Sequence, residues 1–143
     1  MKKYKLGYTS GVFDLFHIGH LNILKKAKEH CDHLIVAVST DELVQSYKNK
    51  TPVIPHVERM EIVKSITFVD EVVAQTNRDK VAAMEKHQFD VMFVGSDWKG
   101  NALFNETERI FNENGVDVVY FPYTSNTSST LLTQVLTKIA QPN

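Results

Sequence analysis

Two histidines, His17 and His20, stand three residues apart in the segment GVFDLFHIGH at positions 11–20. Residues three apart on a helix share one face, so both imidazoles can act on the same ligand. A helix beginning near Ile18 would present free N–H groups and a partial positive charge beside them, which suits a phosphate. Gly11 lets the backbone turn tightly and approach that ligand. The pattern indicates a site that stabilises charge on phosphate oxygens during group transfer.

Two other interpretations of this segment remain open. The histidines could simply satisfy local backbone groups by hydrogen bonding. They could instead bind a transition metal together with Asp14, because carboxylate and imidazole ligands can share such an ion. The other loops predicted to follow strands hold no further histidine or cysteine, which disfavours the metal site.

The rest of the chain predicts the elements that position this segment. Apolar runs predict strands, and apolar residues at helical spacing predict helices. The strands are expected at residues 5–9, 33–39, 69–74, 91–95 and 116–121. The helices are expected at residues 18–30, 41–47, 57–66, 79–87, 106–112 and 129–140. The last helix has the clearest apolar stripe, from Leu131 to Ile139, and that stripe is predicted to lie in the core.

Strands that alternate with helices predict an α/β fold, with a parallel sheet and helices on both faces. We expect one domain over residues 1–143 with five parallel strands. In such sheets, ligands bind beyond the carboxyl ends of the strands. Loops rich in glycine, hydroxyl and carboxylate groups follow four of the five strands, at residues 11–20, 39–42, 95–100 and 123–130. These loops are predicted to meet at one edge of the sheet and form a site.

Composition and charge narrow the class of protein. The net charge is −1 with 23% charged residues, so there is no large basic field and no nucleic-acid partner is expected. The lone Cys31 excludes a disulfide within the chain and is expected to be a buried thiol. No apolar run approaches the length of a signal peptide or a membrane span. We therefore expect a cytoplasmic protein without direct membrane insertion.

The motifs together resemble those of the HxGH nucleotidyltransferase superfamily. FDLFHIGH is similar to its cytidylyltransferase branch, and STDELV, ERMEIV, FVDEVV and GSDWKG occur in the order of that family. Among small members the best match is to the glycerol-3-phosphate cytidylyltransferases. The resemblance implies a Rossmann-like fold, a homodimer and a reaction that uses Mg²⁺. It also implies transfer of CMP from CTP to a small phosphorylated alcohol, first of all glycerol 3-phosphate, with release of pyrophosphate.

The same resemblance implies roles for individual residues. His17 and His20 would contact the triphosphate and stabilise the transition state, and Asp14 would help to hold the site or a metal. The residues expected to contact the acceptor are Asp41, Lys48 and Arg59. Lys48 would also be catalytic, reaching a phosphate of the nucleotide or the acceptor from a mobile loop. The nucleotide-binding residues would be Gly11, Val12, Phe13, Asp14, Asp97, Trp98, Tyr123, Ser128, Ser129 and Thr130.

Two cations of the family pattern are replaced by neutral residues. Tyr123 stands where the family usually has arginine, and Thr67 stands where it often has a basic residue. A neutral tyrosine does not replace the charge or the planar fork of an arginine at a phosphate. Two alternatives therefore stay open: an ATP-dependent adenylyltransferase, and a nucleotide-binding module that has lost turnover.

Overall fold

The structure, a computed structural model, describes residues 4–122 and 129–140, without the side chains of Asp97, Ser129 and Thr130. The strands are β1 (Tyr4–Gly11), β2 (Cys31–Ser39), β3 (Glu71–Gln75), β4 (Val91–Gly95) and β5 (Asp117–Phe121). The helices are α1 (Ile18–Glu29), α2 (Asp41–Lys48), α3 (His56–Lys64), α4 (Lys80–His87), α5 (Ala102–Glu113) and α6 (Ser129–Ala140), with a short 3₁₀ helix η1 (Ser96–Trp98). Each predicted element is present; β4 and α6 have the predicted ends, and the ends of the others are shifted.

The largest shift is at the start of α5. The apolar pattern predicts this helix from residue 106, but it begins at Ala102. Asn101 caps the helix, because its side chain accepts a hydrogen bond from the N–H of Phe104 at 3.1 Å. The cap starts the helix one turn before residue 106, and Phe104 in that first turn is buried.

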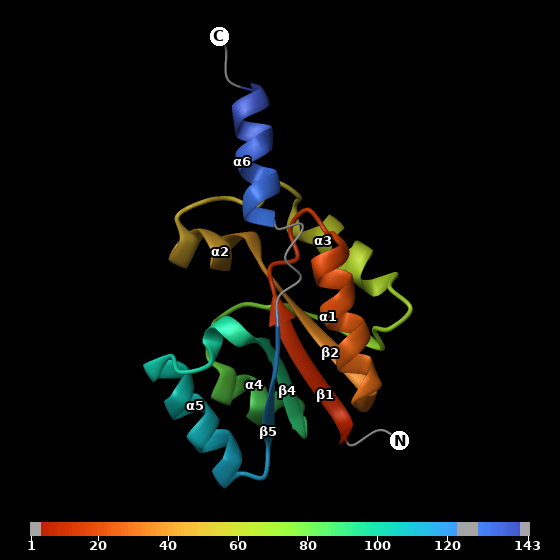
Figure 1. Cartoon of the computed structure of the whole chain (residues 1–143), viewed down its shortest axis with the longest axis vertical. Helices are drawn as coiled ribbons and strands as arrows, with labels where there is room; N and C mark the ends of the chain where they lie inside the picture. Colours follow the sequence, from red (N-terminus) through yellow and green to blue (C-terminus); the bar gives the residue numbers. More distant parts are fainter. Residues whose placement is uncertain (1–3, 123–128, 141–143) are drawn as a thin grey trace.

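The five strands form one parallel sheet in the order β3-β2-β1-β4-β5 (Figure 1). This confirms the predicted α/β fold with a Rossmann-like sheet. β1 is central, and the chain runs outward from it in opposite directions, first through β2 and β3 and later through β4 and β5. The direction therefore reverses between β1 and β4, and such a point is where open α/β sheets bind their ligands.

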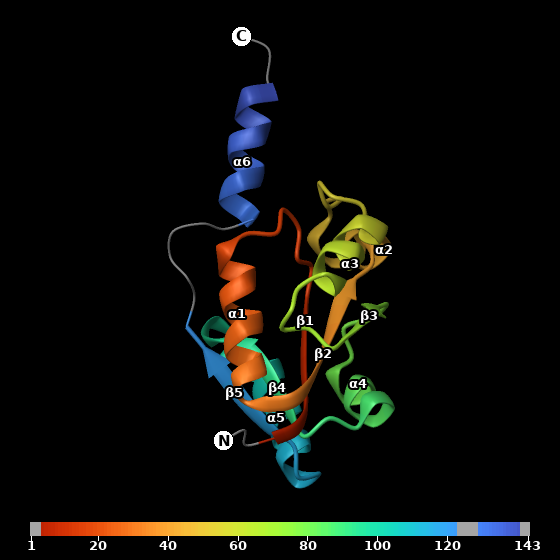
Figure 2. The same ribbon diagram turned by 90° about the vertical axis from the view of Figure 1, so that its right-hand side faces the viewer.

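Helices cover both faces of the sheet (Figures 1 and 2). Leu24 and Ala27 of α1 and Val63 of α3 pack in one apolar cluster, and Met84 of α4 and Phe111 of α5 pack in another. All five residues from 34 to 38 in β2 are less than 5% exposed. The prediction of a strand buried on both faces is thus confirmed.

Gly7 lies in β1, where side chains of β2 and β4 approach it closely. A Cβ at this position would lie 2.7 Å from the ring of Phe93 and 2.8 Å from the Sγ of Cys31. Only glycine fits there without displacing its neighbours. Cys31 is fully buried, with its Sγ 3.4 Å from the carbonyl oxygen of Ala27, which confirms the expected buried thiol.

The apolar stripe of α6 is not in the core. Leu131, Val135 and Leu136 are each nearly half exposed, and Ile139 is 75% exposed. Figures 1 and 2 show α6 standing beyond the end of the sheet, away from the two helical layers. The core prediction is wrong because helical periodicity identifies an apolar face without identifying what covers it. None of the described helices has the length and apolar character needed to cross a membrane.

Candidate active site

A cavity of about 820 Å³ opens where the central strands end. The loops that follow β1, β2 and β4 all contribute to its lining, so three of the four predicted loops meet there. Thr133 of α6 also reaches the cavity. The predicted site residues in its lining are Gly11, Val12, Phe13, Asp14, His20, Lys48 and Trp98. The predicted residues Tyr123 and Ser128 lie outside the described residues, as do the side chains of Asp97, Ser129 and Thr130.

His17 and His20 cap the N-terminus of α1 reciprocally. The Nδ1 of His17 accepts a hydrogen bond from the N–H of Gly19 at 3.0 Å. In return, the Nδ1 of His20 accepts one from the N–H of His17 at 3.2 Å. The two rings stack with their centroids 4.0 Å apart, and His20 lines the cavity. The backbone role that sequence left open is therefore real, and it also fixes how both rings point.

This capping determines where each imidazole carries its proton. A ring nitrogen that accepts an N–H bond bears no proton, so in the neutral ring the proton is on Nε2. Burial, followed by the charge of His17, lowers the pKa of His20 to about 4, although Asp14 opposes this. Burial also lowers the pKa of His17. Both rings are therefore neutral Nε2–H donors at neutral pH, suited to bonding a phosphate oxygen.

We expect the His20 imidazole to titrate with a midpoint near pH 4 in the folded protein. The folded-state pKa lies below the ordinary value of 6.5, so the native state binds fewer protons than the unfolded state. The stabilising contribution of neutral His20 is therefore full above about pH 6.5 and is lost as the pH falls from there toward 4. NMR titration of the ring signals measures the midpoint, with the urea-unfolded chain as reference. A folded-state midpoint near 6.5 would contradict the assignment.

The loop between β1 and α1 has a strained backbone. Phe13 and Leu15 have φ values of +54° and +50°, in the left-handed region that non-glycine residues rarely adopt. Between them, the carboxylate of Asp14 accepts the N–H of Val53 at 2.8 Å and that of Ile54 at 2.9 Å. Such strain persists only where the surroundings hold it, and here the two bonds to the 53–54 backbone do so.

The Asp14 bonds also bear on the metal hypothesis. Each of its carboxylate oxygens already accepts a backbone N–H. Among the described residues, no three histidine, cysteine, aspartate or glutamate side chains come together in a group that could hold a metal. The donor set does not fit a resident metal ion, so we assign Asp14 to positioning the loop.

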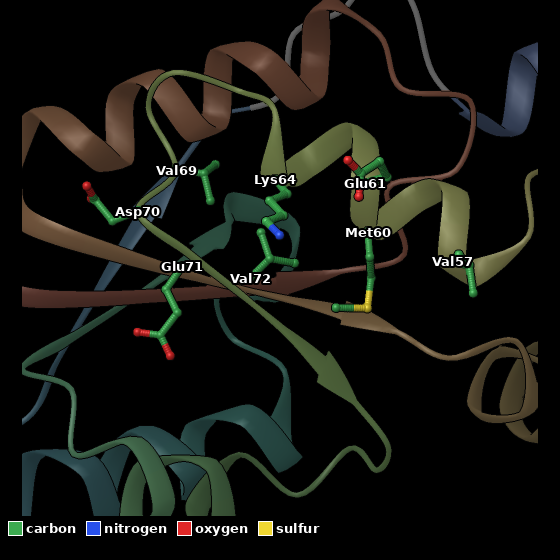
Figure 3. A pocket seen from close by; sticks show the side chains of 8 residues that line it. All are labelled: Val57, Met60, Glu61, Lys64, Val69, Asp70, Glu71 and Val72. Atoms are coloured by element: carbon green, nitrogen blue, oxygen red, sulfur yellow. The ribbon is translucent and has the colours of Figure 1, made fainter.

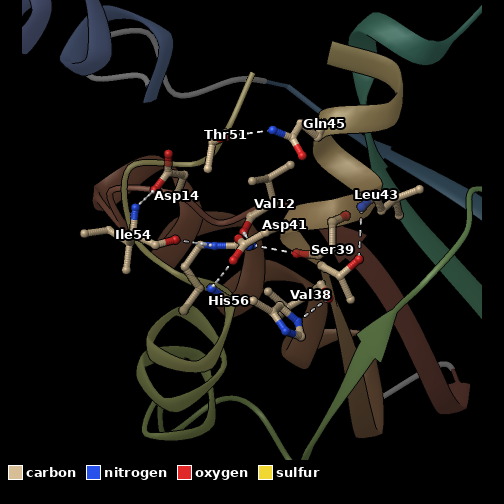
Figure 4. A network of polar contacts seen from close by, with 12 residues as sticks. Val12, Asp14, Val38, Ser39, Asp41, Leu43, Gln45, Thr51, Ile54 and His56 are labelled. Atoms are coloured by element: carbon tan, nitrogen blue, oxygen red, sulfur yellow. Dashed lines mark hydrogen bonds and ion pairs between the residues drawn. The ribbon is translucent and has the colours of Figure 1, made fainter. Parts of the chain in front are cut away.

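Arg59 lies in α3 and is 1% exposed, and it does not line the cavity. Its Nη1 donates to the carbonyl oxygens of Val12 and Ser39, both at 2.7 Å, and its Nε donates to that of Ile54 at 2.8 Å. Its Nη2 pairs with the Oδ1 of Asp41 at 2.6 Å (Figure 4). Arg59 thus joins the ends of β1 and β2 to the loop before α3. We therefore interpret it as a positioning residue, although the resemblance implied an acceptor contact.

Asp41 belongs to the same network. It also accepts the N–H of His56 at 3.2 Å, in addition to its ion pair with Arg59 (Figure 4). Burial raises the pKa of the Asp41 carboxyl, but the bonds from Arg59 and His56 outweigh it and hold the pKa below its usual value. Asp41 therefore stays ionised and, like Arg59, does not line the cavity.

Two cationic residues that line the cavity, Arg78 and Lys80, belong to no sequence motif. Arg78 and Lys80 follow β3, whose end carries no glycine and was not among the loops predicted to form the site. The Nζ of Lys80 donates to the Oγ of Ser10 at 2.8 Å and to the Oε1 of Gln75 at 3.2 Å. Burial, and then the charge of Arg78, lower the pKa of Lys80 to about 8. The rule that sites gather at strand ends would have found both residues if it had been applied to β3.

The opposite side of the cavity is aromatic. Trp98 of η1 packs against Phe104 of α5 with ring centroids 5.7 Å apart. Both residues and Asn101 line the cavity next to the ends of β4 and β5. Trp98 remains 39% exposed, so part of its ring is available for stacking. The cavity therefore has a cationic side at β2 and β3 and an aromatic side at β4.

A smaller groove of about 420 Å³ lies between α3 and the edge strand β3 (Figure 3). Valine and methionine side chains line it, with three carboxylates and one ammonium group. The excess of carboxylates disfavours a phosphate ligand. None of the site residues predicted from the sequence lines this groove, so the larger cavity is the candidate active site.

Comparison with known proteins agrees with this geometry. Residues 8–139 match the family model described as cytidylyltransferase-like. The chain is 37% identical to the glycerol-3-phosphate cytidylyltransferase of Bacillus spizizenii, over 85% of this chain and 89% of that one. It is 36% identical to the Staphylococcus aureus protein of the same name, over 90% and 92% of the two chains.

More distant relatives differ in name. An FAD synthase of Thermococcus sibiricus is 30% identical, over 93% of this chain and 90% of that one. Among solved structures, the lipopolysaccharide core biosynthesis protein of Thermoplasma volcanium superposes with a TM-score of 0.71 at 23% identity, covering 87% of this chain and 99% of that one, which shows a shared fold. With the family model spanning most of its length, this chain belongs to the cytidylyltransferase-like family.

Proposed function

We propose that this protein transfers CMP from CTP to a small phosphorylated alcohol and releases pyrophosphate, with glycerol 3-phosphate as the reference acceptor. The observation that carries the proposal is the neutral Nε2–H imidazole of His20, which lines a cavity that also holds several cations. The ring of His17, which is not among the residues that line the cavity, is stacked on that of His20. The names of the relatives at 36–37% identity support the same acceptor.

In the proposed step, an oxygen of the acceptor phosphate attacks the α-phosphorus of CTP. A new P–O bond forms as the bond from the α-phosphorus to the bridging oxygen breaks, and pyrophosphate leaves with that electron pair. The acceptor phosphate is already deprotonated, so no general base is needed. His17 and His20 donate hydrogen bonds to the triphosphate as its charge redistributes, and the N-terminus of α1 adds its dipole. Mg²⁺ enters as part of the substrate, chelated by the triphosphate.

We place the two substrates on different sides of the cavity. Lys48 and Lys80 supply positive charge on the β2 and β3 side, where we place the acceptor phosphate. Trp98 offers a ring on the β4 side, where we place the pyrimidine base. The triphosphate then lies between them, beside the ends of β1 and α1. In-line transfer then requires the pyrophosphate to leave toward the N-terminus of α1, on the side of the α-phosphorus away from the acceptor phosphate.

A second candidate is adenylyl transfer from ATP, which the 30% identity to an FAD synthase favours. Pyrophosphate release measured with Mg²⁺, CTP or ATP, and a panel of phosphorylated alcohols and FMN separates the two. We expect release from CTP with a phosphorylated alcohol. Turnover of ATP alone would overturn the assignment of the base.

Thermal shift with each nucleotide tests the third possibility, a binding module without turnover. A nucleotide at 100 times its Kd stabilises the folded state by about 2.7 kcal/mol. Stabilisation by CTP together with the absence of pyrophosphate release for every acceptor would contradict the proposed enzyme and favour the module.

A further inference from the structure

Three cations, Lys48, Arg78 and Lys80, lie on the β2 and β3 side of the cavity, and Lys50 lines the same cavity. Lys48 ends α2, Arg78 lies in the loop after β3, and Lys80 begins α4. The guanidinium carbon of Arg78 lies 4.2 Å from the ring centroid of Tyr47, and the Nζ of Lys48 lies 5.7 Å from it. The three positive charges therefore surround one end of the cavity.

Among the described residues, the carboxylate of Asp14 offsets only part of this charge: it raises the pKa of Lys48, but burial and the charges of Lys50 and Arg78 lower that pKa by more. None of the three cations forms an ion pair with a described carboxylate. The nearby Asp79 caps α4, accepting the N–H of Ala82 at 3.0 Å. Burial is the largest cause of the lowered pKa of both lysines, and the charge of Arg78 lowers each further. Mutual repulsion of this kind is relieved when an anion binds among the cations.

The cluster holds more positive charge than one acceptor phosphate needs. A phosphate dianion is balanced by two ammonium groups, and Lys48 and Lys80 supply them. Arg78 differs from both, because it carries a planar guanidinium group that is stacked on Tyr47. Stacking fixes the plane of the guanidinium while leaving its N–H edge available to a ligand. Such a fork matches two coplanar oxygens, which a carboxylate provides.

We propose that Arg78 is a specificity-determining residue that binds a carboxylate on the alcohol portion of the acceptor. The preferred substrate is then a phosphorylated hydroxy acid, with its phosphate between Lys48 and Lys80 and its carboxylate on Arg78. This inference rests on the proposed function, since it concerns the acceptor of the same transfer. It also explains a cluster of cations in which amino-alcohol phosphates, with their own positive charge, would be repelled.

The test compares two acceptors of the same length. 3-Phosphoglycerate differs from glycerol 3-phosphate by a carboxylate in place of a terminal CH₂OH group. With CTP and Mg²⁺, we expect kcat/KM for 3-phosphoglycerate to exceed that for glycerol 3-phosphate by at least about tenfold, the scale of one charge-assisted bidentate contact. Arg78→Gln should remove this preference, and Arg78→Lys should restore only part of it. Lys86→Gln removes an equal charge from the exposed face of α4 and should leave the preference unchanged.

The outcomes separate the two proposals. If the wild type uses glycerol 3-phosphate at least as efficiently, the Arg78 inference is overturned while the proposed transfer stands. The same holds if Arg78→Gln keeps the wild-type ratio. If no acceptor releases pyrophosphate from CTP, the proposed function itself fails. Because Arg78 is exposed, its variants should fold, and their melting temperatures check this directly.

Discussion

Replacing His17 by asparagine is expected to lower the rate of nucleotidyl transfer by a factor of about 10²–10³, the usual cost of removing one donor to transition-state charge. The folded state should remain almost as stable, because asparagine is also a good N-cap and can accept the N–H of Gly19. The substitution thus removes the Nε2–H donor and keeps the cap. Single-turnover pyrophosphate release and urea unfolding measure the two effects separately.

Three further variants complete this test. His20→Ala should cost a similar factor in rate and some stability, because the N–H of His17 loses its acceptor. The double variant should lose less than the product of the two single losses, because the rings act on one triphosphate. His33→Ala changes an exposed histidine of β2 that pairs with Glu71 and does not contact the α1 N-terminus, so it should leave the rate unchanged. A rate for His17→Asn within twofold of the wild type would show that this imidazole is not a donor in the reaction.

Arg59→Met is expected to lower the free energy of unfolding by about 3–5 kcal/mol, the scale of breaking one side of a buried ion pair. The loss arises because the carbonyl oxygens of Val12, Ser39 and Ile54 lose their donor inside the protein. Methionine fills most of the volume, so the effect reports on polar contacts rather than on a cavity. Urea unfolding at pH 7 measures the change.

A conservative variant shows whether charge alone suffices. Arg59→Lys keeps the charge but lacks the planar fork that reaches several acceptors at once, so it should recover only part of the loss. Hydrogen exchange at the N–H groups of Val53 and Ile54 should quicken in both variants, because the loop they belong to loses an anchor. A loss below about 1 kcal/mol for Arg59→Met would contradict the positioning role.

The sheet was predictable because the residue types in its strands indicate strands directly. The run from Leu34 to Val38 is apolar throughout, as burial on both faces requires, and the structure buries all of it. The rule that ligands bind at strand ends predicted that the segments of His20 and Trp98 meet, and the family resemblance added Lys48; all three line one cavity. These predictions use local periodicity and topology, which sequence displays directly.

The remaining features depend on contacts between distant residues. Arg59 resembles any helical arginine in sequence, and only its burial against the backbone of residues 12, 39 and 54 reveals its role. Asp14 likewise meets partners about 40 residues away. Arg78 and Lys80 follow β3 in a segment without a motif. Their place in the site is visible only from the contacts of Arg78 with Tyr47 and of Lys80 with Ser10. α6 shows the converse. Its apolar stripe is clear in the sequence, but the sequence does not identify the surface that would cover the stripe, and the structure leaves it exposed.

The central place of β1 has a consequence for synthesis of the chain. β1 pairs with β2 early in the sequence, but its other neighbour is β4, which contacts it at Gly7 and Tyr8. At roughly 5–20 residues per second, β4 leaves the ribosome roughly 1–4 s after β3. During that interval the open edge of β1 is a template for pairing with other nascent chains. When β4 pairs with β1, it closes this edge, and the aromatic side of the cavity follows β4 in the chain. The same event therefore removes the edge that could pair with other chains and completes the cavity that binds the nucleotide.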